Sequence, residues 1–190
     1  MINFILMFSY EKRSNEMLNS IDWPEGYLPG TTDNFVSNEV IVEGLSTKDV
    51  WPYLVQAKLW PTYYHNSSDI NLNGADQLQK GLVFFFKTFG FPVDAKVIEL
   101  VEPINDQPAR IAWHGWAGEL NSNDRLDVYH AWLIENLPNN RVRILTQETQ
   151  KGLPAKELAN TIPNPMLNGH QAWLDGIVKI AKSNDSHSVV

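Results

Sequence analysis

The chain has 190 residues, of which 43% are hydrophobic and 19% are charged, a length and balance that fit one globular domain rather than a disordered chain. Its formal net charge is −7, and the 15 Lys and Arg form no cluster, so neither nucleic acid nor an anionic membrane surface is an expected partner. The sequence contains no cysteine, which excludes disulfides and thiol chemistry and is compatible with the cytoplasmic location that we expect.

The two ends of the chain are expected to lie outside the folded domain. The apolar run from Ile2 to Phe8 is too short to span a bilayer, and it lacks the basic region and the cleavage site of a signal peptide. We therefore expect residues 1–17 to be disordered, or to reflect a start codon placed too early with Met17 as the real start. Residues 183–190 are expected to form a disordered tail, and no membrane span is predicted.

Turn-forming residues are dense between residues 18 and 35, which predicts an extended arm laid over the domain. Alternation of apolar and polar residues predicts the first strand over residues 35–43. Ser46 and Asp49 have the spacing of a capping box and indicate the start of a helix. Two short helices are expected next, at residues 50–55 and 63–65.

Six further strands are indicated by alternation or by aromatic and β-branched residues, with short turns between them. They are residues 69–72, 82–89, 93–101, 110–116, 126–136 and 142–149. After Gly152 the pattern becomes helical, with a short segment over 156–162 and a longer helix from about residue 167 to 182. The order predicts one α+β domain over residues 18–182, in which a seven-stranded sheet is covered by one long helix.

His130 and Glu148 are titratable residues on strand faces that are otherwise apolar. Their neighbours on these faces are Val128, Trp132, Ile144 and Thr146. If the strand register aligns the two side chains, they have two interpretations, and both stay open. The pair either forms a structural hydrogen bond that fixes the register, or Glu148 orients His130 for general acid–base chemistry as a catalytic pair.

An apolar cavity is expected on the same face, under the last helix. The candidate ligand-binding residues, chosen by alternation, are Phe86, Trp113, Val128, Trp132, Ile144 and Thr146. His170, on the last helix, is interpreted as part of the helix–sheet packing. No metal and no cofactor are expected, because the sequence lacks the HExxH, HxH and paired-carboxylate spacings, the phosphate loop and the nucleotide fingerprint.

Several short motifs together resemble the START-like (SRPBCC, helix-grip) superfamily, in particular its polyketide cyclase/dehydrase-type members. The motifs are Trp51-Pro52-Tyr53-Leu54, Trp60-Pro61, Phe86-Lys87-Thr88-Phe89-Gly90, Arg110-Ile111-Ala112-Trp113, Tyr129-His130-Ala131-Trp132, Thr146-Gln147-Glu148-Thr149 and Gly169-His170-Gln171-Ala172-Trp173-Leu174. The resemblance covers residues 22–182. It implies a helix-grip fold, in which a seven-stranded antiparallel sheet wraps around the C-terminal helix and a hydrophobic cavity lies between them.

The members of this superfamily include lipid and polyketide carriers, cyclases, hydrolases and chaperone co-regulators, so the fold alone does not select one function. The interpretation that we favour is binding of an apolar small molecule, which is polyketide-, lipid- or hormone-like, by a monomer or homodimer. One alternative is a polyketide cyclase or dehydratase that uses His130 and Glu148 for proton transfer. Another is a regulatory protein that docks a partner through an outer-face run of Phe85, Trp116 and Tyr129.

Overall fold

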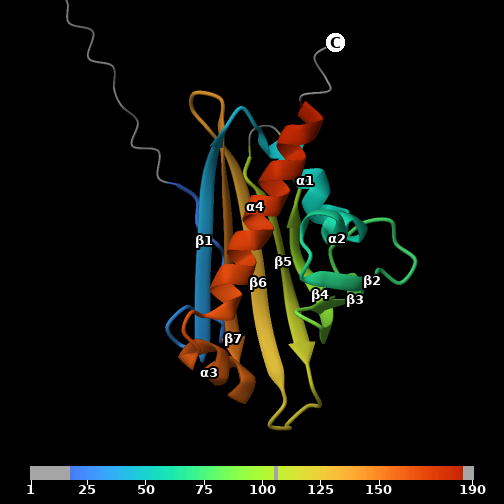
Figure 1. The fold of residues 1–190 in the computed structure, drawn as a ribbon, viewed down its shortest axis with the longest axis vertical. Helices are drawn as coiled ribbons and strands as arrows, with labels where there is room; N and C mark the ends of the chain where they lie inside the picture. The colour runs from blue at the N-terminus through green and yellow to red at the C-terminus, as the bar shows by residue number, and fades with distance from the viewer. Residues whose placement is uncertain (1–17, 105–106, 186–190) are drawn as a thin grey trace, which may run out of the picture.

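A computed structural model describes residues 18–104 and 107–185. Its elements are β1 (Asn34–Glu43), α1 (Thr47–Val55), η1 (Ala57–Leu59), α2 (Trp60–Tyr63), β2 (Ser67–Asn71), β3 (Val83–Thr88), β4 (Phe91–Val101), β5 (Ala109–Ala117), β6 (Leu126–Leu137), β7 (Arg141–Lys151), α3 (Leu153–Asn160) and α4 (Pro165–Asp185). The strands form one antiparallel sheet in the order β1-β7-β6-β5-β4-β3-β2, and α4 crosses one face of it (Figure 1). The predicted α+β helix-grip architecture is confirmed. The expectation for residues 1–17 lies outside the described residues. The tail expected over residues 183–190 is wrong for residues 183–185, which belong to α4, and the rest of that prediction lies outside the described residues.

The predicted elements are present, and the largest differences concern prolines. The helix expected over 156–162 is α3, which begins at Leu153 with Pro154 in its first turn. The helix expected from residue 167 is α4, which begins at Pro165. Proline is tolerated in a first turn because the N–H that it lacks would have no partner inside the helix. Pro154 and Pro165 therefore stand at the starts of these helices.

Strand register brings residues from three neighbouring strands side by side. His130 of β6 pairs with Glu148 of β7 on one side and with Trp113 of β5 on the other. Directly opposed residues in an antiparallel pair project from the same face of the sheet. The inner face of the sheet therefore carries all three side chains in a row.

The main core lies between this inner face and helices α1, α2 and α4. Trp132 and Ile144 from the sheet are nearly or fully buried there, together with Leu174 and Ile177 from α4. These buried side chains hold the C-terminal half of α4 against the sheet. Among the described residues, no helix has the combined length and apolar character that crossing a membrane would require.

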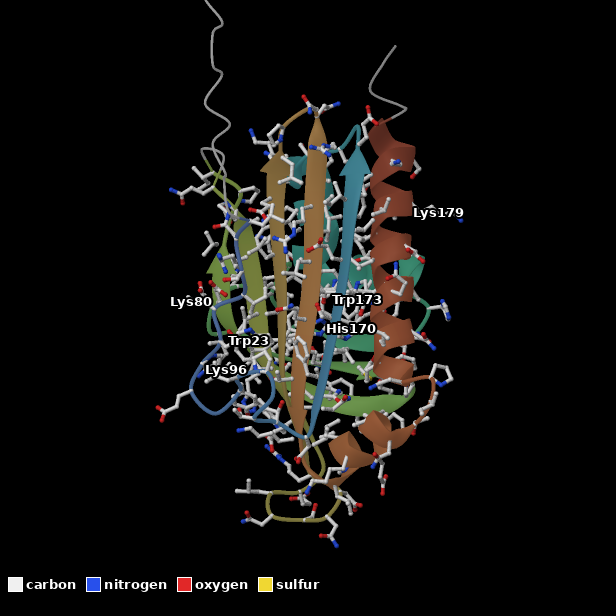
Figure 2. The ribbon with its side chains drawn as sticks, turned by 90° about the vertical axis from the view of Figure 1, so that its left-hand side faces the viewer. Trp23, Lys80, Lys96, His170, Trp173 and Lys179 are labelled. Carbon is white, nitrogen blue, oxygen red and sulfur yellow. The ribbon has the colours of Figure 1, made fainter. Side chains whose placement is uncertain are left out.

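The predicted arm covers part of the outer face. Ile21 is buried in a second apolar cluster with residues of β5, β6 and β7. The rings of Trp23 and Tyr27 lie 5.7 and 5.9 Å from that of Tyr129, and Figure 2 shows Trp23 on the side of the sheet opposite α4. The expected exposed run of Phe85, Trp116 and Tyr129 is wrong, because Tyr129 is only 4% exposed beneath the arm.

Candidate functional site

A cavity of about 700 Å³ lies between the sheet and the N-terminal half of α4. Its walls include Phe86 and Val128 from the sheet, Tyr64 beyond α2, Leu158 of α3 and Met166 of α4. Pockets of about 300–1,000 Å³ with mostly apolar walls are typical small-molecule sites. The cavity therefore has the size and character of a site for an apolar ligand.

The structure corrects the expected lining in part. Phe86, Trp113 and Val128 line the cavity, whereas Trp132, Ile144 and Thr146 do not. Trp132 and Ile144 belong to the solid core beneath α4, and Thr146 is fully buried beside His130. Alternation predicts the face on which a side chain lies. It does not predict where along the strand the helix lifts away from the sheet.

His130 and Glu148 form the predicted hydrogen-bonded pair at the cavity wall. His130 Nδ1 lies 3.0 Å from Glu148 Oε2, and His130 Nε2 lies 2.8 Å from Thr146 Oγ1. Because a carboxylate only accepts hydrogen bonds, the proton of the neutral imidazole is on Nδ1. Nε2 then accepts the hydrogen bond that the Thr146 hydroxyl donates. Both nitrogens of His130 are thus occupied by protein groups.

His170 completes the cluster. Its predicted place in the helix–sheet packing agrees with its burial, but its approach to Glu148 was not predicted. The ring is 1% exposed and stacks on that of His130 at 4.5 Å and 13°, and Figure 2 shows it between α4 and the sheet. Its Nε2 lies 3.6 Å from Glu148 Oε2. The signal in the sequence was a titratable residue beside an apolar helix stripe, the same kind of signal that singled out His130.

Burial and the contacts within the cluster together set the protonation of the pair. Burial lowers the pKa of His130 to about 4, His170 acts in the same direction, and the Glu148 carboxylate opposes both. Burial raises the pKa of Glu148, but its interactions with His130 and His170 outweigh burial and hold that pKa well below its usual range. The state that fits both directions at neutral pH is an ionised carboxylate that accepts a hydrogen bond from a neutral imidazole.

A chain of side-chain amides stabilises this buried anion. Asn164 donates to Asn34 at 3.1 Å, Asn34 donates to Gln150 at 2.6 Å, and Gln150 donates to Oε1 of Glu148. Each amide donates to the next acceptor, so the dipoles all point toward the carboxylate and polarise one another. The chain connects the segment between α3 and α4 to the cluster and leaves Oε2 of Glu148 for the two imidazoles.

Aromatic rings pack against the cluster where it does not face the cavity. The ring of Trp173 lies 5.6 Å from that of His130 and stacks on Tyr64 at 4.4 Å. Trp113 lies 4.6 Å from His130. Burial raises the pKa of Tyr64 to about 12, so its phenol stays protonated in the cavity wall. Such a poorly hydrated surrounding strengthens every electrostatic interaction inside it.

A scan against models of known protein families finds no match, and no curated protein matches the sequence. Solved structures do match. The hypothetical protein jhp0584 from Helicobacter pylori is 51% identical, covers 87% of this chain and 98% of its own, and has a TM-score of 0.82. A point mutant of norcoclaurine synthase from Thalictrum flavum, in complex with a transition-state analogue, is 14% identical over 80% and 95% of the two chains, with a TM-score of 0.57. Ara h 8.0201 is 13% identical over 79% and 99%, with a TM-score of 0.55.

The sheet that grips α4, together with these neighbours, defines a START-like (SRPBCC, helix-grip) fold, as the sequence motifs predicted. Within it, the chain belongs to the same family as the Helicobacter pylori hypothetical protein, with which it shares half of its residues over nearly the whole of that protein.

Proposed function

We propose that the protein binds an apolar small molecule, which is polyketide-, lipid- or hormone-like, in the cavity beneath the N-terminal half of α4. The observation that carries the proposal is the cavity itself, with its volume of about 700 Å³ and its aromatic and aliphatic walls. Removing apolar surface of the ligand from water would contribute roughly 25 cal/mol per Å² before the costs of association. The polar cluster at the wall would orient the ligand.

The test is binding of a neutral apolar dye, Nile red, with displacement by long-chain and polycyclic compounds. We expect saturable binding at one site in the wild type. Val128→Trp and Met166→Trp place an indole in the cavity from two different elements, and each should abolish binding. Ile41→Trp is the matched control, because Ile41 is a strand residue that is 46% exposed on the outer face. Equal loss of binding in Ile41→Trp, or unchanged binding in both cavity variants, would contradict the proposal.

A second measurement identifies the ligand class. Native mass spectrometry of freshly purified protein should detect a co-purifying apolar molecule, and the two cavity variants should lack it. The same experiment reports the oligomeric state, for which monomer or homodimer stays a prediction. A cytoplasmic location also stays a prediction, which cell fractionation checks.

The second candidate function is an enzyme that catalyses aldol-type cyclisation or dehydration in the same cavity. The observation in its favour is the hydrogen-bonded His130–Glu148 pair at the wall, with a neutral imidazole at neutral pH. The norcoclaurine synthase among the neighbours in fold supports this alternative, because one fold can host both carriers and enzymes. Steady turnover of a ring-closing polyketide substrate that is lost in His130→Gln would select the enzyme. Saturable binding without turnover would select the carrier.

A further inference from the structure

Three side chains from three distant elements bring metal-ligating atoms together at the cavity wall. They are His130 of β6, Glu148 of β7 and His170 of α4, and one donor atom of each lies within 4.8 Å of the others. All three residues line the cavity, and all three are at most 4% exposed. The expectation of no metal rested on local spacings, which a site assembled from separate elements does not contain.

The distances within this cluster suit a shared ion. Both imidazoles approach the same carboxylate oxygen, Oε2 of Glu148, which lies 3.0 Å from His130 Nδ1 and 3.6 Å from His170 Nε2. Ligand atoms about 2.0–2.2 Å from one tetrahedral metal ion lie roughly 3.3–3.6 Å from each other. The distance from His170 lies at the upper end of this range and the distance from His130 lies just below it, while the two imidazole nitrogens are within 4.8 Å of each other. Binding an ion would therefore require the side chains to move together around it.

For His130 and Glu148, the atom that does not face the shared position is already held by another group. Thr146 Oγ1 contacts the far nitrogen of His130, and Gln150 donates to the far oxygen of Glu148. Partners of this kind orient metal ligands and select which donor atom faces the ion. Thr146 can orient His130 both without and with a bound ion. Its hydroxyl donates to Nε2 in the present tautomer, and it would accept from Nε2–H when Nδ1 binds an ion.

His170 supplies an independent observation that points to a ligand. Its Nδ1 is buried without a hydrogen-bond partner, and the 3.6 Å between its Nε2 and Glu148 is too long for a hydrogen bond. A buried polar group without a partner costs about 1–3 kcal/mol, and a missing ion is one recognised explanation for such a group. The ring now stacks on that of His130 and would have to turn for its lone pair to meet an ion.

We propose that His130, Glu148 and His170 bind one divalent first-row transition-metal ion. Two imidazoles and one carboxylate without a thiolate suit zinc or iron(II), and three protein ligands leave a coordination position open. Because all three residues line the cavity, that position faces the space that the apolar ligand would occupy. This inference does not rest on the proposed function, since an ion would bind whether or not the cavity takes an apolar molecule.

The test is a titration of the chelator-treated, full-length protein with Co²⁺, followed by its visible absorption, and with Zn²⁺ against a chelating indicator. We expect one ion per chain and a Co²⁺ spectrum typical of four or five ligands. His170→Gln and Glu148→Gln should each weaken binding about 100-fold or more, since even partners of metal ligands contribute 10–100-fold. His65→Gln is the matched control, because His65 is exposed and lies outside the cluster. Binding that is absent in the wild type, or unchanged in both cluster variants, overturns the proposal.

A measurement on the wild type alone keeps the proposal falsifiable if a variant does not fold. The chain has five histidines, whose ring signals are separable by NMR. One equivalent of Zn²⁺ should shift the ring signals of two buried histidines and leave the other three unchanged. A shift confined to other histidines, or no shift at all, places no ion in the cluster and overturns the proposal.

Discussion

Thr146 illustrates how a residue can serve the site without touching the cavity. It is fully buried on β7, and its hydroxyl lies 2.8 Å from His130 Nε2. The hydrogen bond ties the far side of the imidazole to the sheet, while Glu148 ties the near side. His130 is therefore oriented at two points, which is the arrangement that fixes the tautomer of a histidine.

Thr146→Val tests this hydrogen bond. Valine has nearly the same shape and suits a strand, but it leaves the buried Nε2 without a donor, so we expect a loss of about 1–3 kcal/mol in the free energy of unfolding. Thr146→Ser is the control, because it keeps the hydroxyl and removes only a methyl group. Urea denaturation measures both variants. A valine variant no less stable than the serine variant would show that the hydroxyl is not engaged.

Asp127 provides a pH-dependent contribution to stability on the outer face. Arg125 donates to both of its carboxylate oxygens at 2.8 Å, and His114 Nε2 lies 3.2 Å from Oδ1. The hydrogen bonds from Arg125 are the main reason why the pKa of Asp127 lies below its ordinary value of 3.8. Because the folded-state pKa is depressed, the stabilisation is present above pH 3.8 and is lost as the pH falls through the folded-state value.

Asp127→Asn should therefore be less stable than the wild type at pH 7, by roughly 1 kcal/mol because the group is partly exposed. The difference in stability between the wild type and Asp127→Asn should narrow as the pH falls below about 4, because the wild-type carboxyl then becomes protonated and loses its charge. Thermal denaturation at pH 7, 5 and 3 measures it. A difference that stays constant down to pH 3 would contradict the assignment.

At the scale of elements, two glycines set how closely α4 approaches its neighbours. A Cβ at Gly176 would lie 2.1 Å from the backbone oxygen of Tyr63, at the end of α2. A Cβ at Gly169, next to His170, would lie 2.3 Å from the ring of Phe89. Both glycines are inside a helix, where glycine is unfavourable by about 1 kcal/mol relative to alanine. Close packing, rather than helix propensity, explains their presence.

Gly176→Ala should therefore destabilise the protein by about 1–3 kcal/mol, although helix propensity alone predicts a gain. Gly169→Ala should cost less, because Phe89 is 36% exposed and its ring can move aside. Adding Phe89→Ala should remove the steric part of the Gly169→Ala loss and leave Gly176→Ala unchanged. Chemical denaturation of the two glycine variants, of Phe89→Ala and of the two double variants measures these effects. A stabilised Gly176→Ala would show that α4 lies farther from α2.

At the scale of the whole molecule, the sheet is covered on both faces by different parts of the chain. Helices cover the inner face, and the arm covers part of the outer face. Arg143 anchors the start of the arm, since its Nη1 donates to the backbone oxygen of Asn19 at 2.8 Å and to Glu135 at 2.6 Å. The arm is thus an integral part of the fold.

Two truncations distinguish the arm from the residues before it. A chain that starts at Met17 should keep its melting temperature. A chain that starts at Thr31 loses the cover over Tyr129, Leu133 and Leu145, and we expect it to lose about 2 kcal/mol, or roughly 4–8 °C in Tm. Calorimetry of the two proteins measures this. A lower melting temperature for the chain that starts at Met17 would show that residues 1–16 pack on the domain.

The sequence alone determined on which face of the sheet each side chain lies and which strands pair with each other. Alternation assigned His130 and Glu148 to the inner face, and the order of strands and short turns predicted that β6 and β7 pair. These properties are local, because a strand alternates with a period of two whatever surrounds it, and a tight turn connects neighbouring antiparallel strands. The arm, the sheet and the closing helix were predictable for the same reason.

The tertiary structure alone decided where the cavity lies between the sheet and α4, and that His170 joins His130 and Glu148. Trp132 and Ile144 share a face with Val128 and His130, yet only the latter two line the cavity. His170 and Glu148 are 22 residues apart in the sequence, and they meet because α4 crosses the sheet at this point. The crossing depends on side chains from α1, α2 and the whole inner face packing together, and no period within a single element encodes that arrangement.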